Sequence, residues 1–219
     1  MKITGKEYIF FDLDGTLTDS QEGICKGLSI MMEHFGIDPA TIDMNVFLGP
    51  SLWYTCPKYL GLNEKQTEEA VTVFRKFYFD KGIYINRLYD GVLDLLEGLK
   101  AAGRKMAVAT GKPENQAKIV TDYFKISSYF EFIGGSSLDD TRSTKSQVIA
   151  HTIKNCSIND SELSKIIMIG DRQNDIQGAK DNKIDSLGIL WGYGTKTELS
   201  TAGANYIFQT PQEVLKALV

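Results

Sequence analysis

Short apolar runs alternate with amphipathic stretches along most of the chain. Six runs have the length and the apolar content of buried strands, and they cover residues 7–11, 105–110, 130–134, 166–170, 186–190 and 205–208. The stretches between them repeat apolar residues at helical spacing. Val92, Leu95 and Leu99 do so, and Asp90 stands where the N-cap of that helix is expected. This alternation predicts a parallel sheet that is covered by helices on both faces.

The alternation is interrupted between residues 18 and 87, where the pattern is helical throughout. Leu28 and Met31, for example, fall on one helical face, which is typical of the core of a helix bundle. We therefore expect an α/β fold with a Rossmann-like parallel sheet built from residues 1–17 and 88–219. A small all-helical domain, residues 18–87, is expected as an insertion after the first strand.

Composition and charge narrow the class of protein. The chain has 219 residues and a formal net charge of −4, and it contains no block of lysines and arginines, which argues against binding nucleic acids or anionic membranes. No apolar run reaches membrane-spanning length, and no charged-then-apolar leader opens the sequence. Cys25, Cys56 and Cys156 share no close spacing and are expected to be free thiols in the cytoplasm. The expected partner is a small molecule, and the expected assembly is a monomer or a homodimer.

Acidic and hydroxyl side chains follow three of the predicted strands: Asp12 and Asp14, Thr110, and Asp171 and Asp175. The carboxyl ends of parallel strands meet at one edge of a sheet, where such folds bind their ligands. Each residue taken alone is explained more simply as a turn or helix-cap residue. Four carboxylates at one edge would repel one another, however. A hard divalent cation with oxygen ligands, Mg²⁺ above all, would neutralise them.

The same residue types fit phosphoryl transfer, because Mg²⁺ commonly works on phosphate oxygens. A carboxylate can attack phosphorus to form an aspartyl phosphate, and a second carboxyl can carry the proton of the leaving oxygen. A hydroxyl, a backbone N–H and a lysine ammonium can hold the phosphoryl oxygens as charge develops, and Thr110, Gly111 and Lys145 supply these groups.

The segments that carry these residues resemble a known family. "DLDGTLTDS" (residues 12–20), "VATGK" (108–112), Lys145 and "GDRQND" (170–175) resemble, in this order, the four motifs of the haloacid dehalogenase superfamily of phosphotransferases. A helical insertion directly after the first motif is what this family calls a C1 cap. The likeness is strongest to the phosphoglycolate phosphatase-like and 5′-nucleotidase-like members.

The resemblance implies a role for each residue of the set. Asp12 would be the nucleophile and a metal ligand, Asp14 the general acid/base with its carbonyl on the metal, Thr110, Gly111 and Lys145 the phosphoryl-binding groups, and Asp171 and Asp175 ligands of Mg²⁺. An Asp at position 14 indicates phosphate esters rather than dehalogenation. The implied activity is hydrolysis of a small phosphorylated metabolite, and a phosphomutase of the β-phosphoglucomutase type on the same scaffold remains an alternative.

Two segments are candidates for contact with the leaving group of the substrate. Trp53 follows a Gly-Pro turn and could stack on a nucleobase, although packing in the core of the helical domain is the simpler explanation. Arg142, in the loop before Lys145, could bind a carboxylate or phosphate of the substrate or be an ordinary surface arginine. In the same loop Asp140 stands where close relatives often have Gly, which could shift the substrate preference.

Overall fold

The computed structural model describes residues 1–139 and 141–219, so the expectation for Asp140 lies outside the described residues. The chain folds into two compact units. The α/β unit comprises Met1–Asp19 and Leu88–Val219, and the helical unit comprises Ser20–Arg87.

The α/β unit is built on one parallel sheet. Within the described residues this sheet has six strands in the order β5-β4-β1-β6-β7-β8, and each neighbouring pair is parallel. The strands are β1 (Tyr8–Phe11), β4 (Lys105–Pro113), β5 (Phe130–Ser136), β6 (Ile166–Gly170), β7 (Asp185–Ile189) and β8 (Tyr206–Phe208). The predicted α/β fold is thus confirmed. β4 runs past Thr110 because Pro113 still pairs with Ser136 of β5 beyond a register shift.

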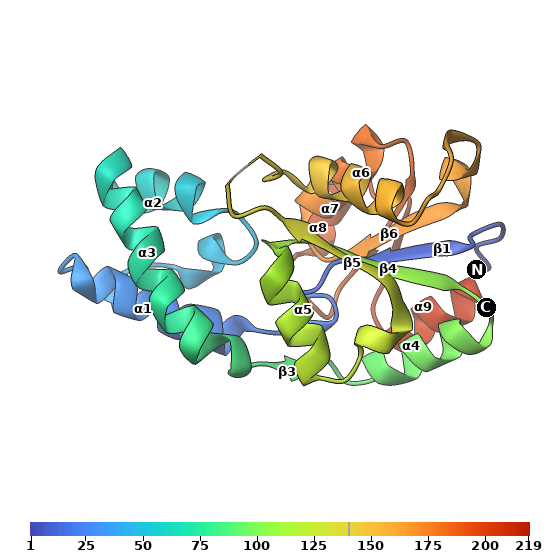
Figure 1. Ribbon diagram of the computed structural model, residues 1–219, viewed down its shortest axis with the longest axis horizontal. Helices are drawn as coiled ribbons and strands as arrows, with labels where there is room; N and C mark the ends of the chain where they lie inside the picture. The colour runs from blue at the N-terminus through green and yellow to red at the C-terminus, as the bar shows by residue number, and fades with distance from the viewer. Residues whose placement is uncertain (140) are drawn as a thin grey trace. The chain divides into compact units, whose positions relative to one another are not determined.

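Helices cover both faces of this sheet (Figure 1). One face carries α6 (Lys145–Asn155) and α7 (Gln173–Asp181), the other carries α4 (Val92–Ala101), α5 (Glu114–Tyr123) and α9 (Pro211–Leu218), and α8 (Lys196–Ala202) lies beside α7 and β8. In β1, Tyr8 and Phe10 share a core with Val148 of α6. Ile9 and Phe11 alternate with them and are equally buried. The strand is apolar throughout because both of its faces are covered.

The remaining elements of this unit are short. They are β2 (Thr18–Asp19) and β3 (Arg87–Leu88), which pair as a separate two-stranded sheet, and the 3-10 helices η4 (Ser127–Tyr129) and η5 (Asp160–Lys165). The sequence did not predict β2 and β3. Asp90 is not the N-cap of α4, because Gly91 holds that position with a left-handed φ of 81°.

The helical unit contains no strand of the six-stranded sheet among its described residues. Its elements are α1 (Gln21–His34), η1 (Pro39–Thr41), η2 (Met44–Phe47), α2 (Leu52–Leu60), α3 (Glu64–Asp80) and η3 (Gly82–Tyr84). Leu28 and Met31 of α1 share a core with Cys56 of α2 and Ala70 of α3. The apolar stripes of the sequence are therefore the inner faces of these helices.

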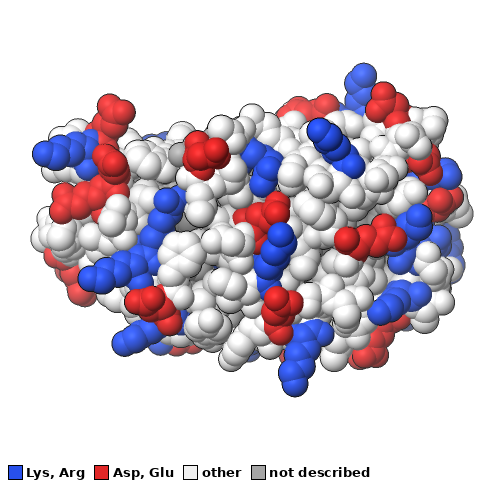
Figure 2. Space-filling view, viewed as in Figure 1, with Lys and Arg blue, Asp and Glu red and all other residues white. Residues whose placement is uncertain are grey.

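The described helices and the face of the molecule in Figure 2 bear on membrane and nucleic-acid binding. Among the described residues, no helix combines the length and the apolar character that crossing a membrane requires. On the face drawn in Figure 2, basic and acidic side chains are interspersed and form no patch of one sign. This face therefore gives no support to a nucleic-acid surface.

Candidate active site

Three aspartates converge at the carboxyl edge of the sheet. Asp12 follows β1, and Asp171 follows the neighbouring strand β6, whose Ile169 accepts a hydrogen bond of 2.9 Å from the backbone N–H of Asp12. Asp175 lies in the first turn of α7. Each of the three carboxylates offers an oxygen within 4.8 Å of the others. Parallel pairing of β1 with β6 thus brings together residues that are far apart in the sequence.

Burial raises the pKa of two of these acids above its ordinary value. Asp171 and Asp175 are fully buried. Burial, together with the charges of Asp175 and Asp12, raises the pKa of Asp171 to about 8, although the N–H of Tyr193 and the hydroxyl of Thr16 donate to it at 2.8 and 3.0 Å. Burial also raises the pKa of Asp175, whereas the ammonium of Lys145 opposes that shift. The cluster would ionise fully only with positive charge beside it.

Lys145 supplies one such charge. It is the first residue of α6, and its Nζ lies 2.9 Å from Oδ1 of Asp12 and 2.8 Å from Oδ1 of Asp175. The same ammonium donates to the carbonyl of Ala109 at 3.2 Å, near the end of β4. Burial alone would lower the pKa of Lys145, but the two carboxylates outweigh it and hold the pKa above its ordinary value. Lys145 is therefore a permanent cation between a candidate nucleophile and a candidate metal ligand.

The end of β4 supplies the predicted phosphoryl-binding groups. Thr110 is buried, and its Oγ1 accepts a hydrogen bond of 3.2 Å from the backbone N–H of Lys112. Because that bond uses an acceptor site of the hydroxyl, the hydroxyl proton remains able to donate to a phosphoryl oxygen. Gly111 between them is exposed, so its backbone N–H lies at the surface of the unit.

Asp14 forms an ion pair with Lys112, a residue to which the sequence assigned no role. Oδ2 of Asp14 lies 2.7 Å from Nζ of Lys112. Oδ1 of Asp14 is buried, and among the described residues it has no hydrogen-bond partner. Asp14 does not belong to the three-carboxylate cluster, and its side chain is held instead toward β4.

Two glycine segments pack closely on Asp171. Gly15 turns the chain after Asp14 with a φ of 84°, in the left-handed region where other residues are strained. A Cβ on Gly192 would collide with Asp171 and with the carbonyl of Gly15, and a Cβ on Gly194 would collide with the carbonyl of Asp171. "GYGT" (192–195) therefore lies directly beside Asp171, and the backbone N–H of its Tyr193 donates to the carboxyl group of Asp171.

The donor set fits a hard divalent cation. Asp12, Asp171 and Asp175 offer only carboxylate oxygens, which are the donors that Mg²⁺ prefers over the nitrogen and sulfur ligands of zinc sites. Burial and the nearby charges of Asp175 and Asp12 raise the pKa of Asp171. A bound cation would offset this effect by stabilising the ionised carboxylate. The described residues thus include a candidate metal site formed by three acids.

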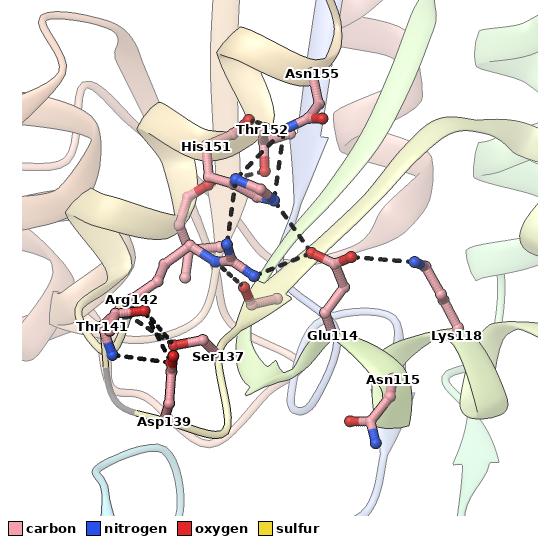
Figure 3. A network of polar contacts seen from close by, with 12 residues as sticks. Glu114, Asn115, Lys118, Ser137, Asp139, Thr141, Arg142, His151, Thr152 and Asn155 are labelled. Atoms are coloured by element: carbon pink, nitrogen blue, oxygen red, sulfur yellow. Dashed lines mark hydrogen bonds and ion pairs between the residues drawn. The ribbon is translucent and has the colours of Figure 1, made fainter.

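Arg142 lies in a polar network beside the loop that leads to α6 (Figure 3). Its guanidinium donates to the carbonyl of Gly135 at 2.7 Å and to Oε2 of Glu114 at 3.2 Å, and it lies 3.3 Å from Nδ1 of His151. Glu114 opens α5, directly after the end of β4. The network therefore links the ends of β4 and β5 to the segment that precedes Lys145.

His151 contacts both Arg142 and Glu114. Nδ1 faces Arg142, which can only donate, and Nε2 lies 3.2 Å from Oε2 of Glu114, which accepts. His151, on α6, thus ties Arg142 and Glu114 into one network.

Trp53 belongs to the helical unit and does not pack in its core. It lies in the first turn of α2, and 39% of its surface is exposed. The simpler explanation offered by the sequence, packing in the helical core, is therefore wrong. The exposed part of the Trp53 ring is accessible to a binding partner from outside the helical unit.

Comparison with known proteins identifies the family of the chain. A family model described as haloacid dehalogenase-like hydrolase matches residues 9–189. A 5′-nucleotidase from Pseudomonas aeruginosa is 37% identical over 195 residues, which are 87% of this chain and 86% of that protein. A phosphoglycolate phosphatase from Aquifex aeolicus is 30% identical over 211 residues, which are 96% of this chain and 95% of that protein.

Two further comparisons concern a kinase and a solved structure. The tyrosine-protein kinase PtkA from Mycobacterium tuberculosis is 37% identical over 189 residues, which are 86% of this chain but only 63% of the kinase. The crystal structure of a predicted phosphatase from Clostridium acetobutylicum superimposes with a TM-score of 0.89 at 39% identity, and the match covers 96% of this chain and 97% of that one.

Proposed function

Because the chain belongs to the haloacid dehalogenase-like hydrolase family and is a phosphatase, we propose that it hydrolyses the phosphate monoester of a small metabolite with the help of Mg²⁺. The proposed intermediate is an aspartyl phosphate on Asp12. A phosphoglycolate-like ester is the proposed substrate, and a nucleoside 5′-monophosphate is the alternative.

One observation carries this proposal. Asp12 directly follows the buried strand β1 and lies in a cluster with Asp171 and Asp175. Lys145 contacts both Asp12 and Asp175. A carboxylate with a cation on one side and a candidate metal site on the other is suited to attack a phosphate dianion, because its own negative charge is offset.

The first half-reaction forms the intermediate. A carboxylate oxygen of Asp12 forms a bond to phosphorus while the bond from phosphorus to the ester oxygen breaks. The electron pair of the broken bond stays on the ester oxygen, which takes a proton from Asp14 and leaves as an alcohol. Thr110, the Gly111 N–H and Lys145 hold the phosphoryl oxygens during this transfer.

The second half-reaction clears the intermediate. A water oxygen forms a bond to phosphorus, gives its proton to Asp14, and displaces the carboxylate of Asp12. Inorganic phosphate leaves, and both aspartates return to their starting protonation. Asp14 thus gives one proton to the leaving alcohol and recovers another from water.

Asp12, Asp171 and Asp175, with the carbonyl of Asp14, would hold the cation. Bound there, Mg²⁺ would supply positive charge that draws the phosphate into place and stabilises the charge of the transition state. Asp12, Asp171 and Asp175 would then be ionised, as the nucleophilic role of Asp12 requires.

The helical unit is proposed to act as a cap that selects the leaving group. Its insertion directly after the first motif supports this role, and the exposed Trp53 is a candidate contact for a nucleobase. Trp53→Ala would then weaken hydrolysis of nucleotides more than hydrolysis of phosphoglycolate.

The test is phosphate release from a panel of esters: phosphoglycolate, nucleoside 5′-monophosphates, sugar phosphates and an aryl phosphate, each with and without Mg²⁺. Asp12→Asn is the control, because its amide cannot act as the nucleophile. Release that needs both Mg²⁺ and Asp12 supports the proposal and ranks the substrates. Isomerisation of a sugar phosphate faster than phosphate appears would favour a phosphomutase, and the absence of any release from folded protein would overturn the proposal.

A further inference from the structure

The two oxygens of Asp14 have different surroundings. Oδ2 lies 2.7 Å from Nζ of Lys112, whereas Oδ1 is buried and has no hydrogen-bond partner in the described part of the chain. The Lys112 side chain is only 4% exposed and the Asp14 side chain 21%. This ion pair is therefore largely shielded from solvent, and it holds the carboxyl group of Asp14 in one orientation.

Lys112 also holds the neighbouring phosphoryl-binding residue. Its backbone N–H donates to Oγ1 of Thr110 at 3.2 Å. One residue thus sets the orientation of a hydroxyl through its backbone and of a carboxylate through its side chain. The two groups would otherwise be placed independently, since Asp14 follows β1 and Thr110 belongs to β4.

We propose that Lys112 is a positioning residue for the proton-transfer step. Its ammonium holds Oδ2 of Asp14 and thereby fixes the direction of the carboxyl group that gives a proton to the ester oxygen and later takes one from water. The inference rests on the proposed function and deepens it, because it assigns a residue that acts through Asp14.

The reason is orientation. A carboxyl group that rotates freely presents its acidic oxygen correctly only part of the time, and misplacement by about 1 Å can cost roughly 10²-fold in rate. A lysine ammonium is a compact charge on a flexible stem, so it can stay in contact with the carboxyl group while the proton is transferred. An ester whose leaving group needs no proton would be insensitive to this arrangement.

The leaving group therefore provides the readout. p-Nitrophenolate departs as an anion, whereas an alkoxide must be protonated as the ester bond breaks. The experiment compares kcat/KM for p-nitrophenyl phosphate and for glycerol phosphate in the wild type, Lys112→Met and Lys112→Arg. Lys154→Met is the matched control, because Lys154 is an exposed lysine of the same unit.

We expect Lys112→Met to lower hydrolysis of the alkyl ester by about 10²-fold and of the aryl ester by about threefold or less, as loss of general acid catalysis would. Lys112→Arg should recover part of the alkyl ester activity because it keeps the charge. An equal loss with both esters would overturn the proposal, since it would mean that Lys112 binds the phosphoryl group directly. Unchanged activity with both esters would also overturn it.

A double variant separates action through Asp14 from any other effect. In an Asp14→Asn background, adding Lys112→Met should change the ratio of alkyl to aryl activity by less than about twofold, because the group it positions is gone. A full additional effect in that background would contradict the inference. The wild-type enzyme separates failure of the proposed function from failure of the role of Lys112. If the wild type shows no Mg²⁺-dependent phosphate release, the proposed function itself is wrong. Lys112→Arg keeps the test open if Lys112→Met does not fold.

Discussion

The ammonium nitrogen of Lys145 lies 2.9 Å from Oδ1 of Asp12. The candidate nucleophile is thus already paired with a cation in the protein alone, and the same cation reaches Asp175 at 2.8 Å. The pair joins the first turn of α6 to the end of β1. Substitution of Lys145 would therefore affect the candidate nucleophile, a candidate metal ligand and the candidate phosphoryl-binding groups together.

Replacing Lys145 should abolish most activity. We expect Lys145→Ala to lower kcat by about 10²- to 10³-fold, the usual effect of removing one group that stabilises transition-state charge. Lys145→Arg should not restore the rate, because a planar guanidinium does not match a compact ammonium between two carboxylates. Steady-state kinetics check this, with Lys154→Ala as the control. A kcat for Lys145→Ala near that of the wild type would contradict the assigned role.

Asp14→Asn should slow both half-reactions and let the phosphorylated protein accumulate. The amide cannot give a proton to the alcohol or take one from water. Intact-protein mass spectrometry after mixing with an aryl phosphate should show one added phosphoryl group, which acid quenching preserves. Asp94→Asn, an exposed acid on α4, should behave as the wild type. Normal turnover by Asp14→Asn would remove the acid/base assignment.

Stabilisation by Mg²⁺ should depend on pH through Asp171. Its pKa rises from an ordinary 3.8 to about 8 in the folded chain. The proton on Asp171 therefore stabilises the metal-free fold fully below about pH 4, and this contribution is lost as the pH rises through 8. A cation must displace that proton, so its binding strengthens over the same interval.

We accordingly expect the rise in Tm caused by Mg²⁺ to be larger at about pH 9 than at about pH 6, since binding competes with the proton at the lower pH. Differential scanning fluorimetry with Mg²⁺ or a chelator measures it. Asp171→Asn should remove most of the Mg²⁺ effect at both values. A shift in Tm that does not change with pH would mean that the cation binds elsewhere.

The Arg142 network should behave as a structural brace. Arg142→Ala removes donors to Gly135 and Glu114, which should cost about 1–3 kcal/mol of unfolding free energy, as the loss of hydrogen bonds to a charged group does. Arg142→Lys should not restore the stability, since an ammonium cannot make the forked contacts. Urea denaturation checks both variants.

Kinetics then decide between the two roles offered for Arg142. A brace predicts that Glu114→Gln, which weakens the same network from the other side, changes stability and KM in parallel with Arg142→Ala. Direct contact with the substrate predicts a rise in KM for Arg142→Ala alone, without any change in the free energy of unfolding.

Much of the fold followed from the sequence, because buried parallel strands and amphipathic helices leave strong periodic patterns. The residues at the ends of β1, β4 and β6 could be assigned to one edge for the same reason. The Lys112–Asp14 pair could not, since it depends on the direction that two side chains take across neighbouring strands. "VATGK" contained the lysine, but it did not indicate the partner.

Other details needed three dimensions as well. Arg142, Glu114 and His151 come from separate segments, and their complementary donors and acceptors appear only once β4, β5 and α6 are packed. Thr16 and Tyr193 bind Asp171 from opposite ends of the sequence. Trp53 was misjudged because the pattern of α2 does not reveal which of its aromatic residues faces outward.

Gly192 and Gly194 lie so close to Asp171 that neither position has room for a side chain. In a saturation mutagenesis experiment these two positions should therefore tolerate as little change as the aspartates, although they carry no functional group. Both glycines should therefore be retained during the evolution of such an enzyme. A search for active-site residues that considers only side-chain chemistry would miss them.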